Sequence, residues 1–247
     1  VDAFPAANPT VDQDGMMVFL TADVGTNLKG FYYWDNANAV WKSISGDKGW
    51  SLTGNSGTNV ATNFIGTMDD QDLIFKRNNL KSGLISIYNT SFGYGTLSTD
   101  NLIFGYYSGK GNTAFGAFTL NSNTTGSSNV AFGENTLAYN TIGTDNSAVG
   151  KSALPSNTTG SGNSAFGSGS LLKNQTGSQN TGIGYRTLWN SNSMNNTAIG
   201  FVSMYENTLG QNNTAVGNHS LNNNKTGNEN VAIGSSSLYL NQNGVSN

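Results

Sequence analysis

Cysteine is absent from the 247-residue chain, and the single histidine is His219. Without cysteine the chain has no disulfide framework and no thiolate metal site. Charged residues make up only 10% of the chain, and its 11 Lys and Arg residues are scattered singly except for the pair Lys76-Arg77. A chain with a formal net charge of −3 and no basic stripe lacks the surface that neutralises phosphates, so we expect no nucleic-acid partner.

Long apolar runs are also missing. The longest one in the N-terminal region covers residues 16–20, far fewer than the roughly 20 residues of a membrane span. We therefore expect no membrane insertion by this segment, and we interpret a chain that starts at Val1 rather than Met as processed or partial. Glycine is abundant, with 32 residues, but 36% hydrophobic residues give the chain material to bury.

A repeat fills the C-terminal part of the chain. Each unit begins at the asparagine of an Asn-x-Ala-Φ-Gly motif, where Φ is Phe, Val or Ile, and the interval is 17 residues except once, where it is 16. These asparagines form the first asparagine column: Asn112, Asn129, Asn146, Asn163, Asn180, Asn196, Asn213 and Asn230. Asn247 stands 17 residues beyond the last of them, so we expect the repeat to continue past it.

Further columns recur in every unit. The alanine column is Ala114, Ala131, Ala148, Ala165, Gly182, Ala198, Ala215 and Ala232. The Φ column is Phe115, Phe132, Val149, Phe166, Ile183, Ile199, Val216 and Ile233. The glycine column follows directly, at Gly116, Gly133, Gly150, Gly167, Gly184, Gly200, Gly217 and Gly234. The leucine column is Leu120, Leu137, Leu154, Leu171, Leu188, Met204, Leu221 and Leu238.

One repeat cannot fold alone. Its two large apolar side chains contribute roughly 1.5–3 kcal/mol each when buried. Ordering its backbone costs roughly 1–2 kcal/mol per residue, so stability must come from stacking each unit on the next. Frequent glycine and the lack of a 3.6-residue period exclude a helix. We therefore predict an all-β fold in which residues 112–247 form a parallel β-solenoid, or β-roll, of 17-residue coils with asparagine ladders between them.

Alternation along the short strand places the Φ column on one face and the alanine and glycine columns on the other. The leucine column is the only other fixed set of large apolar side chains. We therefore expect Φ and leucine inside the coil and a flat Ala/Gly strip outside. Such a strip allows another backbone to approach closely, and we infer that three chains meet along it, either intertwined or side by side.

The repeat resembles the YadA-like head repeat of trimeric autotransporter adhesins over about residues 89–247, although the adhesin unit is usually shorter. A closer resemblance is to tail-fibre-like proteins of Bacteroidetes and their phages, because residues 121–133 read Asn-Ser-Asn-Thr-Thr-Gly-Ser-Ser-Asn-Val-Ala-Phe-Gly. Those proteins often end in an intramolecular chaperone of the endosialidase type. The resemblance implies a homotrimer and a role as an extracellular fibre.

Residues 1–80 lack the repeat and are predicted to form a small N-terminal β domain rich in hairpins. Residues 30–34 and 39–44 flank the turn cluster Asp35-Asn36-Ala37-Asn38 and predict one such hairpin. Residues 81–111 hold two irregular copies of the motif, at 89–93 and 101–105, which we expect to cap the solenoid.

Catalytic and metal-binding patterns are weak. His219 is expected to be a solvated side chain, and a chain with one histidine and no cysteine offers no persuasive base for a nucleophile. Asp69-Asp70-Gln71-Asp72 is the one acidic cluster, for which a solvated turn is favoured over a calcium site. We therefore predict no enzyme activity, no catalytic residue, no metal site and no cofactor.

The variable columns carry one cluster of bulky side chains. Tyr185 and Phe201 occupy one outward column of two successive repeats, and Trp189 and Tyr205 occupy another. Because stacked coils lie about 4.8 Å apart, these four residues are predicted to form one exposed aromatic patch. We interpret the patch as a glycan-binding site; the alternative is that it covers the shortened coil or a groove between chains.

These features favour a structural and receptor-binding fibre that attaches to a cell surface, as a tail fibre of a phage or phage-like particle or as a bacterial adhesin. Its partner would be a cell-surface glycan or protein. The first alternative is a trimeric β-solenoid polysaccharide depolymerase, but the coils offer only the isolated acids Glu134, Asp145, Glu206 and Glu229. The second is an ice-binding solenoid, which would use outward Thr-x-Thr ladders. We disfavour it because asparagine and alanine are expected at the matching positions.

Overall fold

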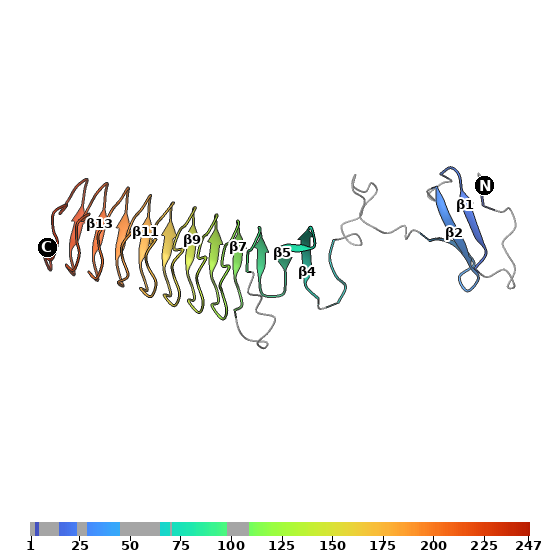
Figure 1. The fold of residues 1–247 in the computed structure, drawn as a ribbon, viewed down its shortest axis with the longest axis horizontal. Coiled ribbons are helices and arrows are strands. Elements are labelled where there is room, and N and C mark those ends of the chain that lie inside the picture. The colour runs from blue at the N-terminus through green and yellow to red at the C-terminus, as the bar shows by residue number, and fades with distance from the viewer. Residues whose placement is uncertain (1–2, 5–14, 24–28, 45–64, 70, 98–108) are drawn as a thin grey trace. The chain divides into compact units, whose positions relative to one another are not determined.

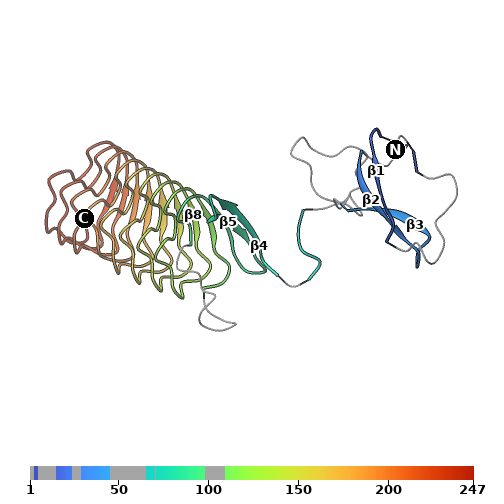
Figure 2. The same cartoon turned by 45° about the vertical axis from the view of Figure 1, so that its right-hand side comes forward.

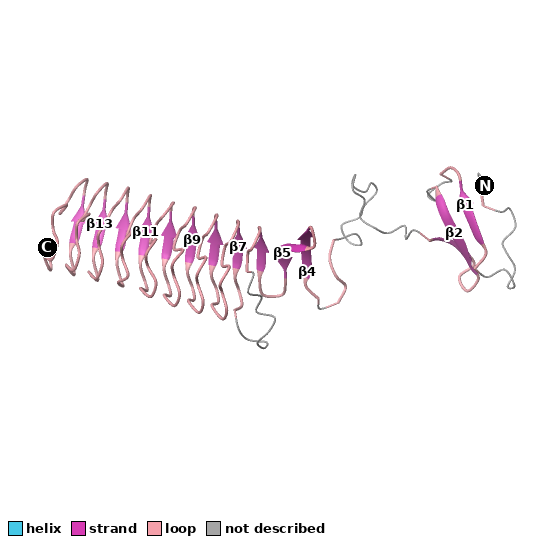
Figure 3. Ribbon diagram, viewed as in Figure 1, coloured by secondary structure: helices cyan, strands magenta, loops and turns pink. Residues whose placement is uncertain are grey.

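The computed structural model describes residues 3–4, 15–23, 29–44, 65–69, 71–97 and 109–247. Within these residues every regular element is a β-strand, and no helix occurs (Figure 3). The chain divides into two compact units, residues 1–66 and 67–247, which are described separately.

The first unit contains a three-stranded antiparallel sheet in the order β1-β2-β3. Its strands are β1 (Met17–Leu20), β2 (Gly30–Asp35) and β3 (Val40–Ser43). The predicted hairpin over residues 30–44 is confirmed, because β2 pairs with β3 around a turn in which the Asn38 amide donates to the Asp35 carbonyl. At the end of this turn Ala39 takes a left-handed φ of 51°.

The aromatic residues of this sheet pack against one another. Tyr32 and Trp34 are buried, and the rings of Trp34 and Trp41 meet edge to face with centroids 5.5 Å apart. An ion pair links Lys42 to Asp35 across the hairpin. The hydrogen bond from Lys42 lowers the pKa of the Asp35 carboxyl to about 2. These contacts show that Tyr32, Trp34 and Trp41 take part in the packing of the sheet.

The second unit is built on one eleven-stranded sheet, whose strands stand side by side in Figure 1. The sheet starts with the antiparallel strands β4 (Leu73–Arg77), β5 (Leu80–Ile85) and β6 (Thr90–Phe92). Eight three-residue strands follow: β7 (Thr113–Phe115), β8 (Val130–Phe132), β9 (Ser147–Val149), β10 (Ser164–Phe166), β11 (Thr181–Ile183), β12 (Thr197–Ile199), β13 (Thr214–Val216) and β14 (Val231–Ile233). The chain makes about seven full turns between β7 and β14, each one repeat long (Figure 2).

Neighbouring coils pair in parallel and in register, so each column of the repeat becomes a straight ladder. Ala148, for example, pairs with Ala131 on one side and with Ala165 on the other. The same register holds across the shortened repeat, where Gly182 pairs with Ala198. The predicted parallel β-solenoid of about 17-residue coils is therefore confirmed.

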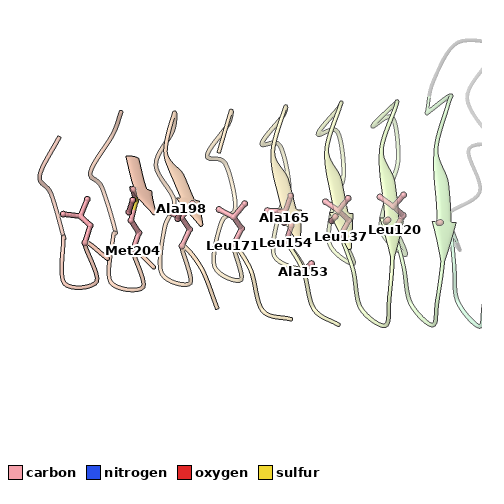
Figure 4. Close-up of a cluster of buried hydrophobic side chains, with 14 of the residues drawn as sticks. Leu120, Leu137, Ala153, Leu154, Ala165, Leu171, Ala198 and Met204 are labelled. Carbon is pink, nitrogen blue, oxygen red and sulfur yellow. The ribbon is translucent and has the colours of Figure 1, made fainter. Parts of the chain in front are cut away.

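The expected assignment of faces is wrong. Every member of the alanine column is inside the coil, packed with the leucine column in a single core that Figure 4 shows as a row. The Φ column points outward instead: six of its eight members are exposed, up to 72% at Ile233, and Phe115 and Val216 are half-buried. The coil interior has no room for two large side chains, because a Cβ at Gly182 would already be in van der Waals contact with Leu171 Cγ at 3.5 Å. The small column therefore faces leucine.

Two buried asparagine ladders complete the interior, as the prediction of ladders between coils required. In the first asparagine column, Asn163 Nδ2 donates to Asn146 Oδ1 at 3.1 Å and to the Gly177 carbonyl at 2.9 Å. The second asparagine column lies within the same coil, after the leucine column, at Asn123, Asn140, Asn157, Asn174, Asn207, Asn224 and Asn241. There Asn157 Nδ2 donates to Asn140 Oδ1 at 2.7 Å. These bonds satisfy side chains that would otherwise be costly to bury.

The glycine column is required by close approach between coils. Gly167 has a φ of +128°, and a Cβ built on it would lie 2.4 Å from the carbonyl oxygen of Gly184. Real Cβ atoms do not come that close to a backbone atom, so only glycine fits. The leucine column also has left-handed φ values, such as 50° at Leu154. Leucine rarely adopts a left-handed φ, so the sequence does not predict this conformation.

The structure describes one of the two irregular copies predicted to cap the solenoid. Residues 89–93 occupy the place of a coil: β6 pairs in parallel with β7, and Asn89 Oδ1 accepts a bond from the Asn112 amide at 2.9 Å. The second irregular copy, residues 101–105, lies outside the described residues. Strand β4 already belongs to the solenoid sheet, so this sheet starts before the expected boundary at residue 80.

Candidate binding surface

The four aromatic residues singled out in the sequence come together on the outside of the coils that carry β11 and β12. Tyr185 and Phe201 stack with ring centroids 5.5 Å apart and an interplanar angle of 15°. Trp189 and Tyr205 stack with centroids 5.8 Å apart, also at 15°. Tyr185 is 41% exposed and Phe201 is 51% exposed. The predicted pairwise stacking between successive coils is thus present.

Arg186 joins the two ring pairs. Its guanidinium carbon lies 4.9 Å from the centroid of the Tyr185 ring and 4.6 Å from that of Trp189. Both distances fall within the range of cation–π attraction, so the rings hold the cation in place. Arg186 therefore lies against one ring of each stacked pair.

Two further residues extend this surface along the solenoid. His219 lies beside Phe201 with ring centroids 5.7 Å apart, and Tyr239 lies beside His219 at 6.1 Å. Sequence reasoning treated His219 as an isolated solvated side chain. Its repeat position matches that of Arg186, and Tyr239 matches Trp189, so column spacing held the signal. We call the combined surface the aromatic strip: Tyr185, Arg186, Trp189, Phe201, Tyr205, His219 and Tyr239.

The shortened repeat contains Trp189, and its irregular turn follows directly after this residue in the chain. Where other coils have an asparagine and a turn glycine, this coil has Ser191 and Ser193, whose hydroxyls share a hydrogen bond of 2.9 Å. Ser193 Oγ also accepts from Asn207 Nδ2 at 3.2 Å. The replacement interrupts the second asparagine column. Asn174 Oδ1, which precedes the interruption, is buried without a hydrogen-bond partner. The strip thus borders the one irregular turn of the repeat.

The acidic side chains of the coils do not gather into a catalytic arrangement. Glu206 Oε2 accepts a hydrogen bond from Asn190 at 3.0 Å, and Glu134 forms an ion pair with Lys151 at 3.0 Å. Glu229 Oε2 accepts from the Ser246 hydroxyl at 3.3 Å. In the part of the chain that the structure describes, no group of three or more His, Cys, Asp or Glu side chains is placed to hold a metal ion.

The acidic cluster near residue 70 forms part of a turn. The Thr67 hydroxyl donates to the carbonyls of Asp69 at 3.1 Å and Gln71 at 2.8 Å. Asp70 lies outside the described residues. These bonds agree with the turn favoured from the sequence.

The outward Φ column forms a second continuous surface. Phe92 of β6 starts it, stacked on Phe115 at 5.5 Å, and Phe115 is stacked in turn on Phe132 at 5.1 Å. Beyond Phe132 the column continues to Ile233 with apolar residues in every coil. The neighbouring outward column holds mainly hydroxyl residues: Thr113, Val130, Ser147, Ser164, Thr181, Thr197, Thr214 and Val231.

No protein-family model, no curated protein and no solved structure matches this chain. No helix among the described residues is long and apolar enough to cross a membrane.

Proposed function

We propose that the chain is a segment of a non-enzymatic, extracellular homotrimeric fibre that attaches to a receptor on a cell surface. The observation that carries the proposal is the division of each repeat into fixed inward columns and variable outward ones. Alanine, leucine and asparagine recur inside every coil, while outward positions range from Glu134 to Tyr185 within a single column. A scaffold of this kind holds different outward side chains at a constant spacing of about 4.8 Å.

The Φ column supplies the surface for trimerisation. An uninterrupted row of exposed apolar residues on a flat sheet is unfavourable in water and is typical of an interface. The resemblance to adhesin heads and tail fibres implies three chains. With the alanine column buried in the coil, it is Φ side chains such as Phe132 and Phe166 that are available to meet the partner chains.

Receptor attachment is assigned to the aromatic strip. Partly exposed aromatic rings together with phenol and imidazole groups are a combination that suits the alternating apolar and hydroxyl-bearing surface of a sugar. A trimer would present the strip three times. Multivalent engagement would then convert weak binding at each site into firm attachment.

Binding of the 247-residue chain to cells that carry the receptor tests this function. Trp189→Ala should abolish binding and leave the melting temperature of the assembly nearly unchanged. Tyr139→Ala is the matched control, because Tyr139 is 63% exposed on a coil outside the strip. Equal binding by Trp189→Ala and the unmodified protein would refute the assignment. A large loss of stability in Trp189→Ala would show instead that the strip serves packing.

One observation favours a second candidate function, ice binding. The reason for disfavouring it from the sequence no longer holds, because asparagine and alanine face inward and a column of mainly Thr and Ser faces outward. Ice binding by Thr-x-Thr ladders would nevertheless need hydroxyls in both outward columns. Here the second is the Φ column, whose members alternate between Phe166 and the smaller Val149 and make the face uneven. Thermal hysteresis in a freezing assay would favour this candidate over the fibre.

A further inference from the structure

The aromatic strip carries a single basic side chain, which forms no ion pair among the described residues. Arg186 is the only Lys or Arg residue of the strip, and its guanidinium is held over the rings of Tyr185 and Trp189. In the described part of the chain, no carboxylate forms an ion pair with it. We infer that the strip binds a carboxylated saccharide, such as one containing uronic acid, and that Arg186 recognises the carboxylate. This inference rests on the proposed role of the strip in attachment.

The environment of Arg186 prepares it for that contact. A guanidinium presents five N–H donors in a plane that matches the two oxygens of a carboxylate. Stacking on two rings restricts the side chain before the ligand arrives, so less conformational entropy is lost on binding. The backbone of Arg186 has a left-handed φ of 53°, and His219 has the same conformation at the equivalent position two coils later. The head group therefore projects from a regular turn of the scaffold.

The nearby acidic group is already engaged. Glu206 follows Tyr205 in the chain, and its carboxylate accepts a hydrogen bond from Asn190. Glu134 forms an ion pair with Lys151, and both residues belong to coils that precede the strip. Arg186 is thus the cation of the strip that can meet a ligand carboxylate, although Glu206 keeps its negative charge and the chain as a whole carries a net charge of −3.

The exposed rings complete the site. Tyr185 and Phe201 form a partly exposed stacked pair against which a sugar ring can pack, and the Arg186 guanidinium lies over the rings of Tyr185 and Trp189. His219 and Tyr239 continue the surface over two more coils. A ligand longer than one sugar can therefore follow the strip along the solenoid.

The test uses the full chain and three immobilised hexasaccharide probes: one with uronic acids, its carboxyl-reduced neutral form, and a sulfated neutral form. An array of further carboxylated and neutral glycans widens the search. The unmodified protein should bind carboxylated glycans roughly tenfold or more tightly than their carboxyl-reduced forms. The preference should weaken as salt is raised, because it depends on charge.

Variants separate a role in recognition from a role in packing. Arg186→Gln should lose the preference for carboxylated probes and bind the reduced form as the unmodified protein does, without a shift in melting temperature. Arg186→Lys should keep part of the preference, since a lysine offers charge without the planar fork. Glu206→Gln, the control beside the strip, should bind carboxylated probes at least as well as the unmodified protein.

Three results would overturn the inference: equal affinity for the carboxylated and reduced probes, a preference for the sulfated probe alone, or no binding to any carboxylated glycan. In each of these cases, loss of cell binding in Trp189→Ala would leave the proposed attachment role intact. Cell binding that is insensitive to Trp189→Ala would refute that role as well.

Discussion

A Cβ atom added to Gly169 would lie 2.5 Å from Cζ3 of the Trp189 ring, so the indole lies directly against this glycine in the preceding coil. Gly169 has a φ of +68°, but the backbone alone does not demand glycine there. Other coils hold Phe118, Ser152 and Arg186 at the same position with left-handed φ values between 52° and 57°. A glycine at position 169 therefore leaves the space that the indole ring of Trp189 occupies.

Gly169→Ala should displace Trp189 from its place in the aromatic strip. We expect reduced cell binding, a shifted Trp189 signal in fluorine NMR of 5-fluorotryptophan-labelled protein, and little change in melting temperature. Gly162→Ala is the matched control, because Gly162 has the same φ of +68° but its added Cβ would have no atom nearer than 3.7 Å. Identical spectra and binding in the two variants would contradict this account of Gly169.

The asparagine ladders should be a main source of stability. Asn163→Ala removes the acceptor of the Asn180 amide, a bond of 3.0 Å, and both bonds of its own Nδ2. Leaving a buried polar group unpaired costs about 1–3 kcal/mol, so the urea midpoint should fall clearly. Asn218→Ala, at an exposed position, should leave the midpoint unchanged. Equal midpoints in both variants would show that the ladder contributes little.

The glycine column should tolerate no side chain where another coil follows. Gly167→Ala would combine a left-handed backbone with a contact of 2.4 Å to the Gly184 carbonyl. Gly234→Ala has a similar φ of +115° but no atom within 4 Å of the added Cβ, so it isolates the backbone strain of about 1–3 kcal/mol. Thermal melts should show a much larger loss for Gly167→Ala. A similar loss in both variants would mean that coil-to-coil contact is not the reason for the glycine.

Hydrolytic activity should be absent. The carboxylates of Glu134 and Glu206 are engaged by Lys151 and Asn190, and neither is paired with a second acid. Incubation with surface polysaccharides should release no reducing ends. Turnover that disappears in Glu134→Gln or Glu206→Gln would instead support the depolymerase alternative.

The sequence was sufficient to predict the coil but not which face of its strand is inside. Spacing alone predicts parallel, in-register stacking, and it also brought Tyr185 and Phe201 together. Alternation cannot choose between two faces, and choosing the more hydrophobic column led to the wrong one. Size was the better signal: the alanine column never exceeds a methyl group because Leu171 and its equivalents fill the interior. The Φ column varies from Val to Phe because its space is open.

This correction changes what substitutions are expected to do. Ala165 is fully buried, so Ala165→Leu would overpack the interior of the coil by roughly 1–3 kcal/mol rather than disturb a contact between chains. Arg186 and His219 were harder to place from the sequence. Their role depends on left-handed turns, which only Asn135 and Gly169 indicate among the residues of that column.

Association through the Φ column is the central claim, and the molar mass of the chain in solution tests it most directly. Light scattering coupled to size exclusion should give three times the chain mass of 25.9 kDa. A double Phe132→Ser and Phe166→Ser variant should dissociate with its circular dichroism spectrum retained, whereas Tyr139→Ser should remain trimeric. A folded, unmodified chain that elutes as a stable monomer would contradict the account.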